Sequence, residues 1–415
     1  MKFLKFIGFC VLLFGLFAFG YAWRDISRGS LPNGETMGAL LNAKPKRAAI
    51  APNQMFSEAY STILAGYYKE FDGRSLKYAG MEGLMASLGD PHTMFMEPKE
   101  TQAFAMETSA NFVGVGARLS PDPAGAKIAV VFDDGPAQKI GLKVGDLITN
   151  VDGAPMAGKD IDDIVSRIRG KAGTRVTITV VRDGVKKPLE FKPTRAKIII
   201  PTVESAMIPG TKFGRIAVSQ FAEPTADQFD RAMQTLAGDG MKGLVVDLRG
   251  NPGGLLETAV EMLSRFASDK VVVRMKGRGE REEVAKTYVG MAKAWPFPIV
   301  VLVNEDSASA SEIFAGCMRD YRLATIVGEH TYGKASVQNV RMLVDGASAK
   351  ITIARYFLPS TGDISRKVDE DGQYVSGGLK PDVTIELDPE KTTVFGEIAK
   401  DAQLAKAVEV LKSKV

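Results

Sequence analysis

The feature that most constrains this chain is the alternation of apolar strands with amphipathic helices after about Ala196. Strand-like runs stand at GLVVDL (243–248), PIVVLV (298–303) and LATIV (323–327), and segments with helical periodicity stand at 255–266 and 312–321. Strands without a polar face are typical of a parallel sheet that helices cover on both sides. Ligand chemistry in such a sheet lies at the carboxyl ends of the strands, so the loops that leave those ends are candidate sites.

The N-terminus carries an uncharged apolar run from Phe6 to Trp23 behind the basic flank MKFLK. Such a run predicts an export signal or a short membrane anchor over residues 1–23. Gly20-Tyr21-Ala22 offers a small-x-small cleavage site, whereas the length of the run favours an uncleaved anchor, so both alternatives stay open. In either case we expect the bulk of the chain outside the cytoplasm, in the periplasm or cell envelope.

The pattern of apolar residues divides the whole chain into six expected parts. Helical spacing marks the third part, and short strands with the apolar helix of DIDDIVSRIR (160–169) mark the fourth, a small and partly open β-barrel with two helices. The parts are a signal peptide or anchor at 1–23, a linker at 24–52, a helical region at 53–104, the small barrel at 105–195, the α/β domain at 196–390 and a helical tail at 391–415.

Charge gives no reason to expect a nucleic-acid partner. The 53 basic and 49 acidic residues are mixed along the chain, and the net charge is only +4. Gly328-x4-Gly333-Lys334 imitates a phosphate-binding loop, but Ala335 stands where the Mg²⁺ ligand is needed, and the residues that follow alternate like a strand instead of opening a helix. The sequence therefore predicts no nucleotide, no cofactor and no metal ion.

Two strand exits carry residues that suit acyl transfer. In DLRGNPGG (247–254), glycines before a helix let bare backbone N–H groups face a developing negative charge, although a tight turn needs glycine too. In NEDSASASEIF (304–314), Ser309 stands on a sharp strand-to-helix turn, where a nucleophile is exposed and the N–H of Ala310 can bind an oxyanion. Ser309 and Glu312 also form a capping box, so a plain helix cap is the alternative.

The third exit, Gly328 to Gln338, supplies a candidate base. His92 and His330 are the only histidines, so a serine-histidine-aspartate triad would have to use one of them. A lysine can replace histidine when burial or a neighbouring cation lowers its pKa, and Lys334 lies in a loop of small residues beside buried strands. Gln338 is four residues beyond Lys334, so in an extended strand it projects from the same side as Lys334 and could orient the lysine amine. The alternatives are a surface lysine and a solvated glutamine.

Seven segments together resemble the carboxy-terminal processing, or tail-specific, serine peptidases over about residues 55–390. In the order of that family they are GDPHTMFM (89–96), FVGVGARL (112–119), GPAQKIGLKVGDLITNVDG (135–153), IRGKAGT (168–174), DLRGNPGG, NEDSASASEIF and VGEHTYGKASVQ (327–338). The resemblance implies a multidomain protein in which the barrel is a PDZ domain and the α/β domain, with its mostly parallel sheet, is ClpP/crotonase-like. It also implies cleavage of proteins near their C-termini by a serine-lysine dyad.

The same resemblance assigns the catalytic residues. Ser309 matches the nucleophile, Lys334 the general base and Gln338 the residue that supports the lysine, while the oxyanion donors would be the N–H groups of Ala310 and Gly253. An aspartate credited in some members would be Asp320, but eleven positions along one helix separate it from Ser309 by roughly 16 Å, so we interpret it as structural.

The PDZ resemblance implies a groove for a peptide C-terminus. Gly114 and Gly116 free successive N–H groups for the terminal carboxylate, and the peptide would add as a strand beside Val113 to Val115, facing the helix at 161–168. Arg169 matches an arginine that links peptide binding to activation in some members, with a helix C-terminal cation as the alternative. The candidate peptide-binding residues are Phe112, Val113, Gly114, Val115, Gly116, Ile161 and Val165.

One segment departs from the family pattern. Members often carry a shorter segment where this chain has residues 363–383, DISRKVDEDGQYVSGGLKPDV. The resemblance therefore does not predict which residues form the edge of the active-site cleft. Apart from this, we expect an exported, membrane-anchored serine endopeptidase. Its partners would be proteins or peptides with accessible C-termini, the membrane through the N-terminal segment, and a second copy or an adaptor protein. The alternative is a non-catalytic PDZ scaffold for exported protein tails, with Ser309 only a helix cap.

Overall fold

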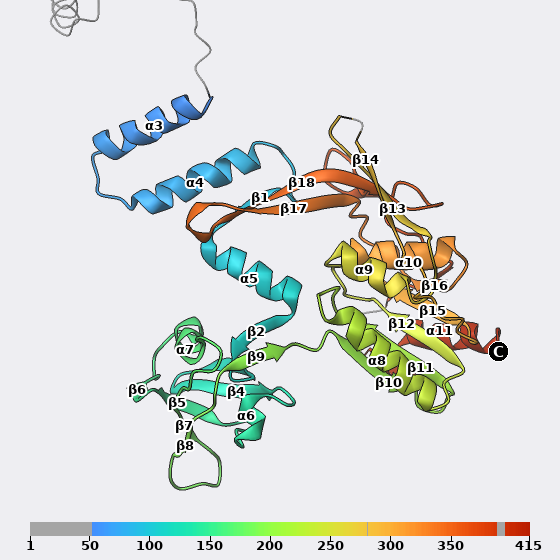
Figure 1. The fold of residues 1–415 in the computed structure, drawn as a ribbon, viewed down its shortest axis with the longest axis horizontal. Helices are drawn as coiled ribbons and strands as arrows, with labels where there is room; N and C mark the ends of the chain where they lie inside the picture. The colour runs from blue at the N-terminus through green and yellow to red at the C-terminus, as the bar shows by residue number, and fades with distance from the viewer. Residues whose placement is uncertain (1–51, 280, 388–394) are drawn as a thin grey trace, which may run out of the picture. The chain divides into compact units, whose positions relative to one another are not determined.

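The computed structural model describes residues 52–279, 281–387 and 395–415 (Figure 1). The predicted signal peptide or anchor lies outside the described residues. Within those residues, no helix is both long enough and apolar enough to cross a membrane. The chain divides into two compact units, Met1–Lys77 and Tyr78–Val415.

The described part of the first unit holds α3 (Pro52–Gly66) and the beginning of α4 (Gly73–Ala86). Asp72 caps α4, since its carboxylate accepts hydrogen bonds from the backbone N–H groups of Arg74 and Ser75 at 3.0 and 3.2 Å. These bonds satisfy two of the N–H groups that the first turn of a helix leaves unpaired. Both helices lie within the range that the sequence predicts to be helical.

The second unit begins with the rest of α4, followed by β1 (Met94–Met96) and α5 (Pro98–Ser109). Strand β1 was not predicted. It pairs antiparallel with β18 (Ser348–Phe357), more than 250 residues later, with Met94 opposite Lys350. The region predicted to be helical therefore also contributes a strand to the sheet that carries the lysine loop.

The PDZ-like part is a small antiparallel sheet with two helices, as expected. The sheet order is β3-β4-β5-β7-β8, with β6 paired to β5. Ile164 and Ile168 of α7 are buried in its core. The elements are β2 (Asn111–Gly114), β3 (Ala117–Asp122), β4 (Gly125–Val131), α6 (Pro136–Lys139), β5 (Leu147–Val151), β6 (Ala154–Pro155), α7 (Ile161–Ile168), β7 (Ile178–Val181), β8 (Leu189–Phe191) and β9 (Ala196–Ile199), which pairs with β2.

The α/β part contains the predicted parallel sheet, in the order β10-β11-β12-β15-β16-β21. Neighbours are parallel from β11 to β21, and β10 is an antiparallel edge strand. The elements are β10 (Val203–Met207), β11 (Phe213–Val218), α8 (Thr225–Gly238), β12 (Gly243–Asp247), α9 (Leu256–Leu263), β15 (Ile299–Val303), α10 (Ala310–Asp320), β16 (Thr325–Gly328), β21 (Val383–Thr384), the 3-10 turn η2 (Ile398–Lys400) and α11 (Ala402–Lys412).

Both faces of this sheet are covered, which explains why its strands lack a polar face. Leu244 and Val246 of β12 point into the core formed with α8, α9 and α10, whereas Val245 between them points into the core formed with α11. Alternate side chains along a strand face opposite sides of the sheet, so a strand buried on both sides must be apolar throughout.

A second, antiparallel sheet was not predicted. Its order is β1-β18-β13-β14, with β17 also paired to β18. Strands β17 and β18 form a long hairpin that brings residues 336–342 beside residues 348–357 (Figure 1). The elements are β13 (Val271–Gly277), β14 (Glu282–Lys286), β17 (Ser336–Met342), the 3-10 turn η1 (Val344–Gly346), β18, and a separate hairpin of β19 (Lys367–Val368) and β20 (Tyr374–Ser376).

Candidate active site

Ser309 lies on the turn between β15 and α10, in a backbone conformation that residues other than glycine rarely adopt. Its φ is +56° and its ψ is −116°. Such a conformation costs about 1–3 kcal/mol and persists only where the surroundings hold it. The hydrogen bond from Ser309 N to Glu312 Oε2 (2.9 Å) and the bond from Ala308 N to Asn251 O (3.0 Å) provide that support. The turn exposes the Ser309 side chain to a cavity of about 580 Å³.

The other two serines of the segment are buried and bonded to the neighbouring turn. Ser307 Oγ donates to Leu248 O at 2.9 Å, and Ser311 Oγ donates to Asn251 O at 3.0 Å. Both side chains are fully buried. They fix the nucleophile turn against the DLRGNPGG turn, and neither lines the cavity that contains Ser309.

Glu312 is the buried residue that joins the nucleophile turn to the lysine loop. Its Oε2 accepts from the backbone N–H groups of Ser309 and Lys334, both at 2.9 Å. Its Oε1 accepts from Gly333 N at 2.7 Å and from the Thr331 hydroxyl. Burial raises the pKa of Glu312, although these hydrogen bonds oppose the shift. The sequence showed Glu312 only as part of a capping box and gave no sign that it spans two loops.

Lys334 lies in the same cavity as Ser309 and is partly buried. Burial lowers its pKa, the positive charge of Lys350 lowers it further, and the charges of Glu312 and Asp90 oppose the shift. Within the described residues, Lys334 Nζ makes no hydrogen bond or ion pair, while the Lys334 backbone carbonyl accepts from the buried Tyr356 hydroxyl. These conditions favour the neutral amine that a general base needs.

Gln338 also lines the cavity, from β17. Its Nε2 donates to Ser336 Oγ at 2.9 Å and to Thr352 Oγ1 at 3.2 Å. Of the two histidines, His92 is half-buried and its pKa is lowered by burial and by the charge of Lys334, whereas His330 is exposed. Neither histidine lines the cavity, so the arrangement does not form a serine-histidine pair.

The glycine turn differs from the prediction in one donor. Gly253 N–H already donates to Asn251 Oδ1 at 2.8 Å. Gly254 lines the same cavity, and its N–H donates to no acceptor in the described part of the chain. The free N–H group of this turn is therefore that of Gly254 and not the predicted one of Gly253. A Cβ on Gly253 would lie 2.8 Å from Ser309 Cβ and 2.9 Å from Ala310 N, so the turn packs directly against the nucleophile.

A buried network of ion pairs holds the strand that precedes this turn. Asp247, 3% exposed, pairs with Arg215 and Arg249, and Arg249 also pairs with Asp401 at the start of α11. Burial alone would raise the pKa of Asp247, but the two arginines outweigh it and the pKa lies below its ordinary value. The network ties the C-terminal helix to the base of the glycine turn.

Residues 363–383 support the lysine loop and do not line the catalytic cavity. Arg366 N donates to Gly333 O at 2.8 Å, and Leu379 N donates to Thr331 Oγ1 at 2.7 Å. Asp320 holds a neighbouring turn: its carboxylate accepts hydrogen bonds from the backbone N–H groups of Ser360 and Thr361 at 2.8 and 3.0 Å.

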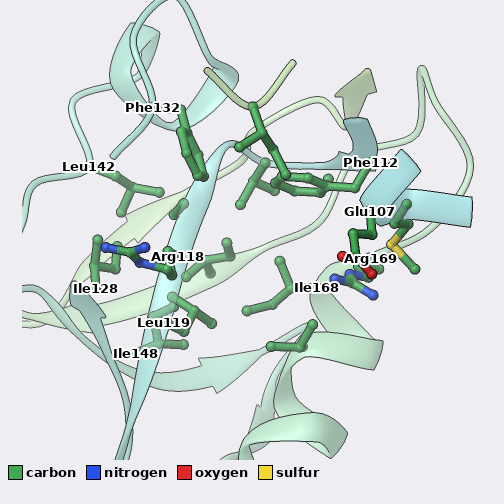
Figure 2. A pocket seen from close by; sticks show the side chains of 17 residues that line it. Glu107, Phe112, Arg118, Leu119, Ile128, Phe132, Leu142, Ile148, Ile168 and Arg169 are labelled. Atoms are coloured by element: carbon green, nitrogen blue, oxygen red, sulfur yellow. The ribbon is translucent and has the colours of Figure 1, made fainter. Parts of the chain in front are cut away.

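A second cavity, of about 350 Å³ and mostly apolar, lies in the PDZ-like part (Figure 2). Of the predicted peptide-binding residues, Phe112, Gly114, Val115 and Val165 line it, as does Arg169, whereas Val113, Gly116 and Ile161 do not. The guanidinium of Arg169 lies 5.8 Å from the centre of the Phe112 ring.

Strands β2 and β3, beside this cavity, each have one edge that is unpaired among the described residues. Val113 pairs with Lys197 of β9 along one edge of β2, and the expected strand addition beside Val113 to Val115 would use the other edge. Strand β3 is the edge of its sheet, contacts α7, and contributes Ala117, Arg118 and Leu119 to the cavity wall. The N–H groups of Val115 and Gly116, just before β3, donate to no acceptor among the described residues, as a carboxylate-binding turn requires.

Among residues 52–279, 281–387 and 395–415, no group of three histidine, cysteine, aspartate or glutamate side chains is arranged to hold a metal ion.

Comparison with known proteins gives matches over both parts. The model of peptidase family S41 matches residues 212–385, and a PDZ domain model matches residues 127–182. The chain is 34% identical over 329 residues to a probable CtpA-like serine protease of Staphylococcus haemolyticus (strain JCSC1435) and 35% identical to one of Staphylococcus aureus (strain COL), in each case over 79% of this chain. It spans 63% of the length of these relatives.

Among solved structures, the photosystem II D1 C-terminal processing protease is 28% identical, and the match covers 86% of this chain and 91% of that one with a TM-score of 0.43.

Proposed function

Because this chain belongs to peptidase family S41 through residues 212–385 and carries a PDZ domain at residues 127–182, we propose that it is a serine endopeptidase acting near protein C-termini. The observation that carries the proposal is that Ser309, in its strained turn, and Lys334, with its lowered pKa, line one cavity and are tied together through Glu312.

In the proposed reaction, the neutral amine of Lys334 removes the proton from Ser309 Oγ as the oxygen attacks the substrate carbonyl carbon. The carbonyl oxygen becomes an oxyanion, and the N–H groups of Ala310 and Gly254 are the donors available to stabilise it. The Lys334 ammonium then gives its proton to the leaving nitrogen as the C–N bond breaks, which leaves an acyl group on Ser309. Water, deprotonated by Lys334, releases that acyl group.

The PDZ domain is proposed to hold the substrate's C-terminus. The free N–H groups of Val115 and Gly116 can bind the terminal carboxylate, the apolar cavity can take the last side chain, and the peptide can add as a strand to the edge of β3. Glu107 of α5 lines both this cavity and the catalytic one, and Arg169 lines the PDZ cavity. Peptide binding in the PDZ cavity could therefore change the catalytic cavity through Arg169 and Glu107.

Three further proposals follow from the sequence pattern. Residues 1–23 would export the chain and anchor it in the membrane, which would put the peptidase in the periplasm or cell envelope. The catalytic domain would have the ClpP/crotonase-like architecture. A second copy of the chain or an adaptor protein would be a partner.

The test is cleavage of an unfolded protein, such as casein, followed by mass spectrometry. Ser309→Ala and Lys334→Ala should each abolish cleavage, while His330→Ala, an exposed residue of the same loop, should leave the rate unchanged. Full activity of Lys334→Ala would refute the dyad. If wild type and Ser309→Ala bind the protein equally and leave it uncut, the chain is instead a PDZ scaffold for protein tails.

A further inference from the structure

The catalytic cavity contains a positive charge that the proposed reaction does not use. Of the described residues that line this cavity, three are charged, namely Glu107, Lys334 and Lys350. Lys334 acts as a neutral amine, so Lys350 is the cation that remains. Among the described residues its ammonium makes no hydrogen bond and no ion pair, and it lies 5.2 Å from the centre of the Phe104 ring, which lines the same cavity. The ammonium is therefore at the cavity wall and available to a substrate.

Pairing in the β17–β18 hairpin places Lys350 between Gln338 and helix α5. Gln338 is opposite Thr352, and directly opposite residues of an antiparallel pair have side chains on the same face. Two residues before Thr352 on β18, Lys350 is on that face as well. Two residues before Lys350, the Ser348 hydroxyl lies 2.8 Å from the Thr101 hydroxyl of α5. Residues two apart on a strand are separated by about 7 Å, so Lys350 is one such step from the level of Gln338 toward α5.

A substrate chain that leads from the catalytic pair to the PDZ domain passes this point. Five consecutive residues of β17, 336–340, line the cavity, so the strand presents its edge to the cavity and not one face alone. That edge is unpaired among the described residues, and an extended peptide can add to it. Glu107, three residues after Phe104 on α5, lines both the catalytic and the PDZ cavity. With the substrate's C-terminus in the PDZ cavity, the segment beside Lys350 is the one that follows the cleaved bond.

We propose that Lys350 is a specificity-determining residue that binds a carboxylate of the substrate within the first three residues after the cleaved bond. A step of about 7 Å spans two residues of an extended chain, which sets this limit. The carboxylate comes either from an aspartate or glutamate side chain or from the end of a short substrate. In a partly buried cavity its attraction to the ammonium is stronger than in open water. This inference rests on the proposed function and adds a negative charge to the substrate class.

The contact is expected to act on substrate binding and not on the chemical step. An ion pair away from the reacting atoms is equally strong before and during bond cleavage, so losing it raises KM and leaves kcat unchanged. One hydrogen bond to a charged group changes kcat/KM about tenfold. We therefore expect a peptide with glutamate beside Lys350 to exceed its glutamine counterpart about tenfold in kcat/KM, through KM.

The test uses synthetic peptides built around one cleavage site that mass spectrometry has mapped in casein. They carry glutamate or glutamine at each of the three positions after the cleaved bond and share one C-terminal sequence. In wild type, glutamate should be preferred about tenfold at one of these positions. Lys350→Met should reduce this ratio to about one, and Lys350→Arg should keep the preference for glutamate. Lys350→Glu should instead prefer a peptide with lysine at that position.

The test separates substrate recognition from the effect of Lys350 on the base. Removing this positive charge also raises the pKa of Lys334, but two peptides cleaved by one enzyme use the same base, so their ratio is unaffected. Lys276→Met is the matched control. Lys276 belongs to β13 of the same antiparallel sheet and lies 5.2 Å from the centre of the Phe357 ring, yet it does not line the cavity. This variant should keep the wild-type ratio.

A second pair of peptides distinguishes the two sources of the carboxylate. These peptides end at the third residue after the cleaved bond, with a free or an amidated C-terminus. A preference for the free acid that Lys350→Met removes, without discrimination between glutamate and glutamine, assigns the carboxylate to the chain end.

Equal kcat/KM values within both pairs in wild type would overturn the inference, as would a preference that survives Lys350→Met. If Lys350→Met does not fold, the charge reversal Lys350→Glu decides in its place. The proposed function fails separately, only if Ser309→Ala still cleaves these peptides.

Discussion

Glu312→Gln is the substitution that most sharply tests how the active site is held together. The glutamate is fully buried, and each of its two oxygens accepts two hydrogen bonds. Glutamine has almost the same shape, but only one end of its side chain accepts. Whichever way the amide turns, an NH₂ group will face two donors.

The size of the effect follows from that geometry. If the amide nitrogen faces the backbone N–H groups of Ser309 and Lys334, the tether between nucleophile turn and lysine loop is lost. If the amide nitrogen faces Gly333 N–H and the Thr331 hydroxyl, the lysine loop loses the hydrogen bonds that these two groups donate to Glu312. Two hydrogen bonds to a charged group, at about 1.5 kcal/mol each, give a loss of roughly 3 kcal/mol in the free energy of unfolding. In a domain of this size that corresponds to a fall in melting temperature of about 6–12 °C.

The assay is equilibrium unfolding in guanidinium chloride, with cleavage of casein measured on the same samples. Glu312→Gln should lose the stated stability and most of its kcat. Glu257→Gln, on the exposed side of α9, is the matched control and should change the free energy of unfolding by less than about 0.5 kcal/mol. If Glu312→Gln unfolds within that same margin of wild type, Glu312 does not hold the two loops and the reasoning is refuted.

Three further outcomes follow. Lys350→Gln should move the acidic limb of kcat/KM to higher pH, because neutral Lys334 is the active form and losing a neighbouring positive charge raises its pKa; a shift to lower pH in the pH–rate profile would contradict this. Gly253→Ala should lower kcat about 100-fold, since its Cβ would lie 2.8 Å from Ser309 Cβ at a φ of +100°, and an unchanged kcat would argue against the close packing. Arg249→Met should cost about 3–5 kcal/mol, measured by denaturant unfolding, because the buried carboxylate of Asp401 loses its ion pair and Asp247 keeps only the one with Arg215; a loss smaller than 1 kcal/mol would refute a buried network.

The parallel sheet could be predicted because burial on both faces makes each strand apolar throughout, and this is visible in the local sequence. Leu244, Val245 and Val246 are apolar without alternation, and the structure buries them on two faces. The turn at Ser309 could be predicted for a similar reason, since a small-residue segment between a buried strand and a capped helix leaves few other conformations.

The antiparallel sheet could not be predicted, because its strands carry no such local signal. Strand β18 is partly exposed along most of its length, and its pairing with β1 joins residues separated by more than 250 positions. Sequence periodicity reports which face of a strand is buried, and it does not report which distant strand lies beside it.

Within the site, residue types could be predicted but not their hydrogen-bond partners. The sequence predicts that Gly253 N–H binds the oxyanion, because glycines stand before a helix. In the structure this N–H donates a hydrogen bond to the side chain of Asn251. The role of Glu312 depends on two loops that meet only in the folded chain. The sequence could show Glu312 only as part of a capping box.

The most direct test of the central claim is detection of the acyl group on Ser309. Wild-type protein would be mixed with a peptide ester that acylates the enzyme faster than the acyl group is hydrolysed, quenched in acid, and analysed by intact-mass and peptide mass spectrometry. We predict one acyl group per chain, on Ser309, forming faster as the pH rises through the titration of Lys334 and absent in Ser309→Ala. Acylation of another residue, or equal acylation of Ser309→Ala, would contradict the account.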